Sequence, residues 1–350
     1  MVRLPNHHSL DIKAFSRIFD STQNSYKHLL FGFLLKELPK LPLTRLLLNA
    51  DEIAKGMLHI AEFPVMRCRL SLGKRDQTSA LLIGGENNAI SDTDLLDWVP
   101  FRLIRPFFAD ALKNKPDQVI NRIIKELTDQ SFDSHSPALY RIHMRDGCVA
   151  GIELHPNWQT YLVEHYDIVD AWRRWHWAEY LQRRNPAALN VIRKLEPPTR
   201  QTHELNKIKA VWSTIAEQGH AALVCTFTAE ALQPGKIVVD HFLPWSYVGH
   251  NQKWNLCPTT QPTNSRKSDK LPSEVYFRNL LNTQLLTLQW VRETKSDKDW
   301  RAFVEDYEVS LQLRDDELLD HSKLQNALRS AIQPHYQLAK NMGFEADWTH

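Results

Sequence analysis

Asp240 and His241 are adjacent side chains that could support hydrolysis of a phosphodiester bond. They stand at the end of a short β-branched run, Ile237–Val239, where a strand gives way to a loop. A neutral imidazole can take a proton from water, and a carboxylate can hold a divalent cation that stabilises charge on the phosphate. Asn264 adds a neutral amide oxygen. Because hard oxygen ligands suit Mg²⁺ or Mn²⁺, we expect Asp240 and Asn264 to bind one of these metals and His241 to act as the base.

Basic residues surround this pair in the sequence. Lys267 is three positions after Asn264, so on a helix both side chains lie on one face, and we expect Lys267 to contact the phosphate during catalysis. Arg266 and Lys270 are expected to bind nucleic acid beside it. Over residues 235–275 Lys and Arg outnumber Asp and Glu, which predicts a positive surface around the pair.

Three short elements are expected to position these side chains. The run Ile237–Val239 predicts a first strand, Gly249 and the polar residues after it predict a turn, and residues 254–257 predict a returning strand. Pro258 is expected to end the hairpin. Pro262 suits the first turn of a helix that would carry Asn264 and Lys267. Strand, loop, strand and helix make a ββα unit.

The motif resembles that of the HNH endonucleases over about residues 218–275. The first His, middle Asn and last Asn of that motif fall on His241, Asn255 and Asn264. The opening D-H-x-x-P-x-S and the ending N-x-x-K-S-D-x-x-P are closest to the variant in the HNH domain of CRISPR effector nucleases and in stand-alone bacterial HNH enzymes. The resemblance implies a metal-dependent endonuclease with Asn255 in the catalytic unit, where it holds the hairpin loop and orients the base.

The resemblance also implies a biological setting. DNA is the expected substrate, and restriction or anti-phage defence is the expected role, with a protein partner from such a system. Two other interpretations stay open. The chain could be an RNA-directed or toxin-like nuclease controlled by a partner, or a catalytically silent module that binds nucleic acid. Each motif residue alone is more often structural than catalytic, so the interpretation depends on their combination and order.

Composition agrees with a globular protein that is mainly helical. The chain has 350 residues, 43% of them hydrophobic, with 11 Trp and 14 Phe, which is enough for a sizeable core. The net charge of +2 is too balanced to indicate a nucleic-acid binder by itself. No run of 18 apolar residues and no amino-terminal signal pattern occurs, so we expect a cytoplasmic protein that does not enter a membrane. The four cysteines form no C-x-x-C pair, which argues against a structural zinc site.

A second stretch, Tyr161–Arg184, has helical periodicity and interleaves basic with aromatic residues. One face carries Arg173, Trp177, Tyr180 and Arg184. Such a face could bind nucleic acid through Arg173 and Arg184, because arginine contacts phosphates and aromatic rings stack on unpaired bases. The alternative, which the pattern favours, is arginine packed against tryptophan where two helices meet.

The fold class predicted from these patterns is α+β, mainly helical, with an embedded HNH ββα-metal unit. Four regions are expected. They are a mostly helical amino-terminal region with a hairpin near 140–154, a helical connector, the nuclease unit and a carboxy-terminal helical region, over residues 1–150, 151–217, 218–275 and 276–350.

Overall fold

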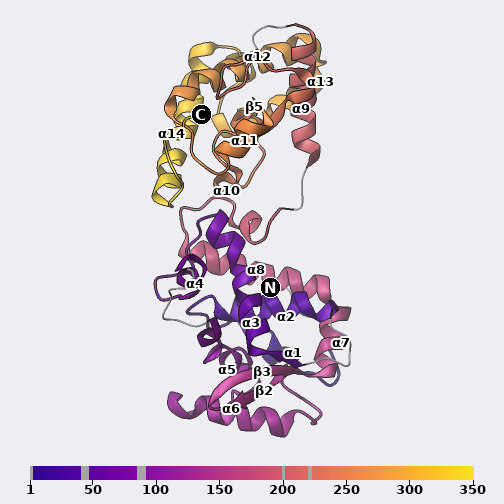
Figure 1. Ribbon diagram of the computed structural model, residues 1–350. Helices are drawn as coiled ribbons and strands as arrows, with labels where there is room; N and C mark the ends of the chain where they lie inside the picture. The colour runs from indigo at the N-terminus through magenta and orange to yellow at the C-terminus, as the bar shows by residue number, and fades with distance from the viewer. Residues whose placement is uncertain (1–2, 41–46, 85–91, 199–201, 220–222) are drawn as a thin grey trace. The chain divides into compact units, whose positions relative to one another are not determined.

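The computed structural model describes residues 3–40, 47–84, 92–198, 202–219 and 223–350 (Figure 1). The chain divides into two compact units, unit 1 from Met1 to Pro186 and unit 2 from Ala187 to His350. Within the described residues each unit combines many helices with one small antiparallel sheet, so the predicted α+β, mainly helical class is confirmed. The division between the units falls inside the predicted helical connector.

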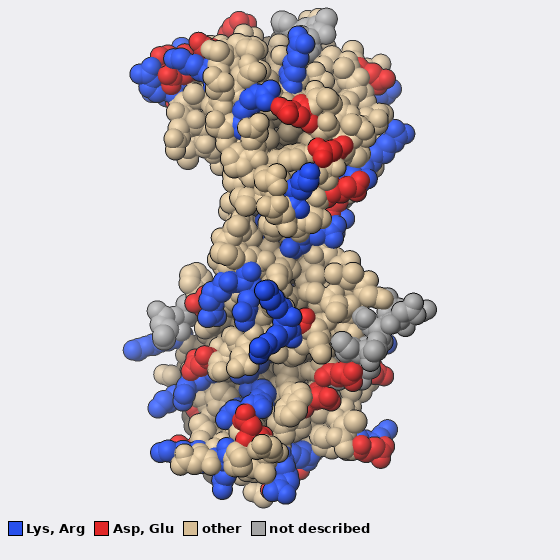
Figure 2. Space-filling model, turned by 90° about the vertical axis from the view of Figure 1, so that its left-hand side faces the viewer, with Lys and Arg blue, Asp and Glu red and all other residues tan. Residues whose placement is uncertain are grey.

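On the face shown in Figure 2, charged side chains of both signs are spread over each unit. On the face of unit 1 in that view, Lys and Arg side chains gather in a group with few Asp or Glu side chains among them. A chain with a net charge of only +2 therefore still has local concentrations of positive charge.

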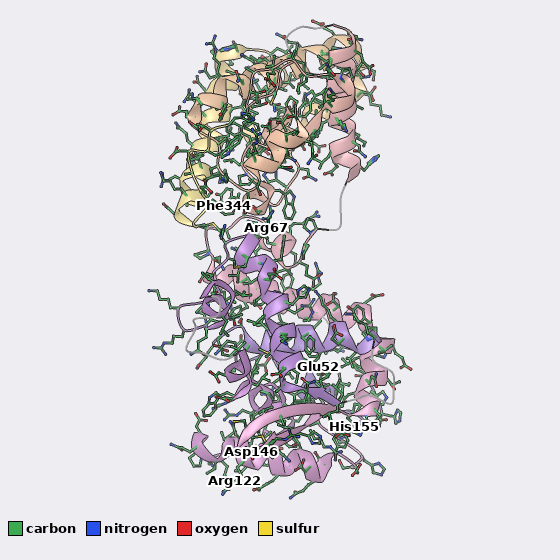
Figure 3. All side chains as sticks on the ribbon, viewed as in Figure 1. Glu52, Arg67, Arg122, Asp146, His155 and Phe344 are labelled. Atoms are coloured by element: carbon green, nitrogen blue, oxygen red, sulfur yellow. The ribbon has the colours of Figure 1, made fainter. Side chains whose placement is uncertain are left out.

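Unit 1 contains the predicted hairpin, and a third strand extends its sheet. Strand β2 (Tyr140–Arg145) pairs with β3 (Cys148–Leu154), and β1 (Leu47–Asn49) pairs with the other edge of β3. Asp146 and Gly147 form the turn with φ of 52° and 82°, as a two-residue hairpin turn requires, and Asp146 lies at its tip (Figure 3). The longer helices of unit 1 are α2 (Tyr26–Glu37), α3 (Ala50–Glu62), α6 (Asp117–Ser131), α7 (Pro156–Glu164) and α8 (Tyr166–Arg184); the shorter ones are α1 (Ile12–Phe15), α4 (Thr78–Gly84) and α5 (Val99–Ile104).

The predicted helix over Tyr161–Arg184 is wrong in one respect, because two helices share this stretch. Helix α7 ends before His165, whose backbone leaves the helical region with φ of −111° and ψ of 25°, and α8 starts directly after it. Helix α8 packs against α2. The contact buries Trp172, Trp177 and Tyr180 in an aromatic core with Phe15 and other rings.

Unit 2 contains the predicted ββα unit. Strand β4 (Val238–His241) pairs with β5 (Leu256–Thr259) in the register Val238↔Thr259 to His241↔Leu256, and α11 (Gln261–Lys267) follows. The prediction that Pro258 ends the hairpin is wrong, since Pro258 lies inside β5 opposite Val239. Its carbonyl oxygen accepts a hydrogen bond from the backbone N–H of Thr226. Both strands of a two-stranded sheet are edge strands, where a proline, which has no N–H, is tolerated.

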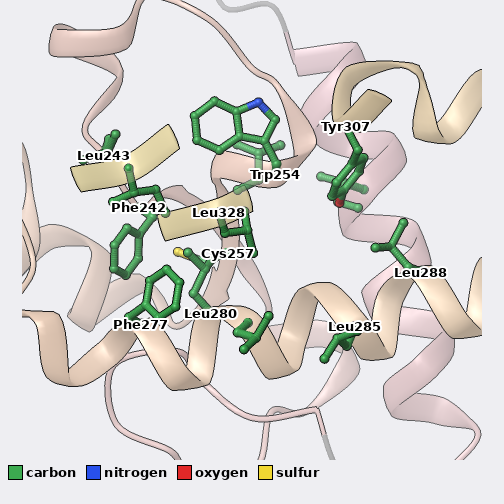
Figure 4. Packing of buried hydrophobic residues seen from close by; sticks show 14 of the residues in the cluster. Phe242, Leu243, Trp254, Cys257, Phe277, Leu280, Leu285, Leu288, Tyr307 and Leu328 are labelled. Atoms are coloured by element: carbon green, nitrogen blue, oxygen red, sulfur yellow. The ribbon is translucent and has the colours of Figure 1, made fainter. Parts of the chain in front are cut away.

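Helices enclose this hairpin in an apolar core. Cys257 and Phe242 come from the hairpin, and they lie near Phe277 and Leu280 of α12 and near Leu328 of α14 (Figure 4). The remaining helices of unit 2 are α9 (Thr202–Glu217), α10 (Trp245–Val248), α12 (Phe277–Thr294), α13 (Asp297–Leu311) and α14 (His321–Asn341). No helix in the described part of the chain is long and apolar enough to cross a membrane.

Candidate nuclease active site

Strand β4 delivers Asp240 and His241 to its carboxyl end, and Asn255 fixes the loop that follows. The Asn255 side chain is completely buried. Its Oδ1 accepts from the backbone N–H of Leu243 and its Nδ2 donates to the carbonyl of Leu243, both at 2.9 Å. The backbone N–H of Phe242 donates to the carbonyl of Asn255 at 2.8 Å. Asn255 therefore replaces strand pairing where the two strands separate, and it holds the backbone directly after the candidate base.

Lys267 connects α11 to the end of β4 from the interior. Its side chain is 0% exposed, and its Nζ lies 3.1 Å from Asp240 Oδ2. The same ammonium donates a hydrogen bond to the carbonyl oxygen of His241 at 2.7 Å. A residue buried to this degree cannot reach a substrate in this arrangement. Lys267 was expected to contact the phosphate, whereas its position suits neutralising Asp240 and fixing the backbone of His241.

Asp240 is itself 7% exposed, and its two oxygens have different surroundings. Oδ1 accepts from the backbone N–H of His241 at 2.7 Å. Oδ2 is at ion-pair distance from Lys267, but no donor in the described part of the chain has hydrogen-bond geometry toward it. A carboxylate oxygen has more than one lone pair, so Oδ2, although buried, has capacity for one more bond.

His241 is 9% exposed, and its imidazole is held by a side chain from the hairpin loop. Its Nε2 lies 2.9 Å from Oδ1 of Asn251, and Nδ2 of Asn251 donates to Glu204 of α9 at 3.2 Å. Burial lowers the pKa of His241 below its ordinary 6.5, and Asp240 and Asn251 oppose that effect only in part. The ring is consequently neutral near pH 7, the form that a general base requires.

A second histidine beside the site is also held neutral. Burial, reinforced by the nearby His241, lowers the pKa of His250 to about 4. Its Nδ1 accepts from the backbone N–H of Gln252 at 3.2 Å, so it shapes the loop that carries Asn251.

Asn264 supplies the amide oxygen that was predicted as a metal ligand. It lies on α11, which packs against β4, and it is partly exposed. Its side chain makes no hydrogen bond to the described residues, so the amide is available to a ligand. No cluster of three or more His, Cys, Asp or Glu side chains suited to a metal occurs among the described residues. A site here would consist of one carboxylate, one amide and further oxygens from water or substrate.

The other basic residues around the motif are mostly neutralised by neighbours. Lys270 pairs with Glu345 at 3.1 Å, and Lys253 pairs with Asp306 at 2.9 Å. Arg266 is exposed, and its Nη1 is 3.2 Å from His350 Nε2. The positive surface expected from residue counts is thus smaller in the folded unit, and Arg266 is its most available cation among these residues.

The two arginines predicted on α8 have different positions. Arg173 is 1% exposed and pairs with Asp170 at 2.6 Å, which matches the helix-packing alternative and leaves its guanidinium out of reach of a phosphate. Arg184 is exposed, donates to the carbonyl of Gln23 at 2.6 Å and lies over the ring of Tyr180. Only Arg184 can therefore meet a ligand from this face.

Sequence reasoning missed Asn251, His250 and Glu204. The polar run from His250 was interpreted as a turn, although it lies between the strands of the hairpin and its Asn251 side chain bonds the imidazole of His241. Glu204 lies 37 residues before His241 in the sequence, so only the packing of α9 shows that it touches the site.

The hairpin and the helix after it hold an Asp-His pair at a strand end, which is the arrangement expected from the HNH motif. Residues 225–273 match the family model described as HNH endonuclease, so the resemblance predicted from the motif is confirmed over this segment. The match supports nuclease activity on nucleic acid. No curated protein and no solved structure matches the chain.

Replacing Asn255 with Ala should lower the free energy of unfolding of unit 2 by about 2–4 kcal/mol, because two buried backbone groups of Leu243 lose their partners. Urea unfolding followed by circular dichroism measures this change. Asn264→Ala is the matched control, since its side chain has no such bonds, and it should change stability by less than about 0.5 kcal/mol. Equal stability of the two variants would remove the loop-holding role from Asn255.

Replacing Asn251 with Ala should lower the pKa of His241 further, because the amide oxygen favours the protonated ring. NMR titration of the labelled histidine ring gives this pKa directly. Gln252→Ala changes the adjacent loop residue, whose side chain bonds to Trp254 and not to His241. This variant should leave the pKa of His241 unchanged. A rise in the pKa of the Asn251 variant would contradict the proposed contact.

Proposed function

We propose that this protein is a divalent-metal-dependent endonuclease that hydrolyses phosphodiester bonds in DNA. His241 is the general base, and Asp240 and Asn264 are the metal ligands. One observation carries the proposal. The segment that matches the HNH family holds a neutral, buried imidazole directly beside a carboxylate with one buried oxygen, Oδ2, that lacks a hydrogen-bond donor among the described residues.

The residues present fit Mg²⁺ or Mn²⁺. Among the described residues, one buried carboxylate oxygen of Asp240 has no hydrogen-bond donor, and the side-chain amide of Asn264 makes no hydrogen bond. Magnesium is typically held by one or two carboxylates while water and substrate phosphate complete its shell, so few protein ligands are needed. When bound, the metal supplies electrophilic stabilisation of charge on the phosphate and the leaving oxygen.

The chain's own residues prepare the base. The neutral ring of His241 can accept a proton from water, and the charge that it gains is stabilised by the adjacent Asp240. Asn251 and the backbone held by Asn255 restrict the orientation of the ring. Lys267 acts as a positioning residue, because it contacts Asp240 and the backbone of His241 from the buried side.

Nucleic-acid binding is supported by exposed cations in both units. Arg266 is exposed beside the motif, and Lys270 lies near it, although partly neutralised. In unit 1 the loop that carries Arg69, Lys74 and Arg75 is fixed to the end of α8, where the hydroxyl of Tyr180 donates to the carbonyl of Leu72 at 2.6 Å.

These three loop cations have no carboxylate partner among the described residues. The nearby carboxylate of Asp76 accepts from the backbone N–H groups of Ser25 and Thr78 instead. The loop can therefore direct unpaired positive charge toward phosphates. The choice of DNA, a role in restriction or anti-phage defence, and a protein partner are supported by the motif resemblance alone.

His241→Ala should reduce the rate of DNA cleavage by on the order of 100-fold or more, the usual scale for loss of a general base. His335→Ala is the control, because His335 is another partly buried histidine of unit 2 whose pKa is also lowered by burial. The rate of the unmodified protein should stay level from pH 7 upward and fall only as pH drops through the lowered pKa of His241, since protonation removes the base. Cleavage by the His241 variant within a few-fold of the original would exclude this mechanism.

Asn264→Ala should raise the Mg²⁺ concentration needed for half-maximal cleavage, because one oxygen ligand is lost. Asp240→Asn should do so more strongly, and it should also lower stability by leaving Lys267 buried without a carboxylate. Gln261→Ala, an exposed change on the same helix, controls for general effects on α11. Metal titration of the cleavage rate distinguishes the three variants, and cleavage that persists in excess chelator would refute the metal assignment.

A further inference from the structure

A basic hollow in unit 1 has no part in the proposed hydrolysis. Its volume is about 400 Å³, and it lies between the segment after α1, the start of α2 and residues 105–115. Its lining contains one carboxylate and five cationic side chains, which are Asp20 and Arg17, Lys27, Arg105, Lys113 and Lys115. A concave surface with this composition attracts anions.

Most of the cations that line the hollow have no carboxylate of their own among the described residues. Arg17 and Asp20 pair at 3.1 Å, which leaves four cations. Arg105 is 3.8 Å from a carboxylate oxygen of Asp117, and Arg102 approaches the same oxygen at 3.6 Å, so that single carboxylate is shared. Lys113 and Lys115 are exposed and form no ion pair with the described residues.

Lys27 lies deeper than the other cations of the hollow. Its Nζ donates to the carbonyl oxygen of Ile18 at 3.0 Å, and its side chain is partly buried. Burial, followed by repulsion from Arg102 and Arg105, lowers its pKa to about 8, and the opposing effect of Asp20 is smaller than these. The Lys27 ammonium is therefore held among like charges without sufficient negative charge, and a bound anion would relieve that repulsion.

We propose that this hollow binds a small ligand that carries phosphate groups, such as a diphosphate or the diphosphate of a nucleotide. Arg105 can offer two parallel N–H groups to phosphate oxygens, and Lys27 can offer a point charge at the inner end. The volume fits a ligand of nucleotide size. A nucleic-acid strand needs a groove that follows its backbone, whereas these cations line a single hollow. The site is independent of the motif in unit 2.

Isothermal titration of the full-length protein with pyrophosphate and with ADP, without divalent metal and at constant ionic strength, tests this proposal. Saturable binding of one ligand per chain is expected. Arg105→Gln and Lys27→Met should each weaken it by about tenfold or more, the scale for one charge-assisted hydrogen bond. Lys55→Gln removes one exposed charge from α3 of the same unit and should leave the affinity unchanged. The His241→Ala variant should bind pyrophosphate and ADP with the affinity of the original protein. Ligand binding is therefore tested separately from nuclease activity.

Absence of saturable binding of both ligands would overturn the proposal. So would equal weakening by Lys55→Gln, which would mean attraction by net charge alone. If Lys27→Met does not fold, as judged by its melting curve, Arg105→Gln and Lys113→Gln decide the matter, because both change accessible side chains. A single-stranded oligonucleotide that loses affinity in these variants, and that neither pyrophosphate nor ADP displaces, would show a polymer-binding surface and refute a small-ligand site.

Discussion

The charge of Lys267 is shielded completely from water, and the arrangement of the site depends on how that charge is compensated. An ammonium in such a place is stable only when paired and hydrogen-bonded, because its desolvation costs several kcal/mol, on the order of the strongest single contributions to folding. Asp240 supplies the countercharge, and the carbonyl of His241 supplies the hydrogen bond. The helix that carries Asn264 is therefore fixed against the strand end that carries the base.

The same exclusion of water sets the chemistry of His241. A less buried imidazole beside a carboxylate would have a raised pKa and would be protonated over part of the neutral range. Here burial outweighs the attraction of Asp240, and the positive charge of Lys267 acts in the same direction as burial. The stability of unit 2 and the reactivity of His241 are thus linked. The ion pair with Lys267 offsets part of the negative charge of Asp240, so Asp240 raises the pKa of His241 less than an unpaired carboxylate would.

The sequence predicted what depends on local pattern and missed what depends on packing. The β-branched run, the Asp-Gly turn and Pro262 placed the ββα unit and the hairpin of unit 1, because each acts through its own backbone preference. Spacing put Lys267 on the face of Asn264, but it could not reveal that α11 turns this lysine inward. Likewise, the burial of Arg173 follows from the contact of α8 with α2. The hydrogen bonds from Asn251 to Glu204 and to His241 join segments that are distant in the sequence, so no periodic pattern of residues could predict them.

The two units differ in how far carboxylates neutralise their cationic side chains. Lys253, Lys267 and Lys270 are paired with carboxylates in unit 2, so the motif retains little free positive charge despite its composition. Pairing of this kind gives precise local geometry but weakens the field that would draw a polyanion from a distance. Unit 1 shows the opposite pattern, because the cations on the loop next to α8 and Lys113 and Lys115 of the basic hollow form no ion pair with the described residues. We infer that the two units contribute differently to a reaction on phosphates. In the proposed nuclease, unit 2 orients the reacting groups, and the cations on the loop next to α8 provide attraction that a net charge of +2 does not reveal, whereas the basic hollow belongs to the separate small-ligand site.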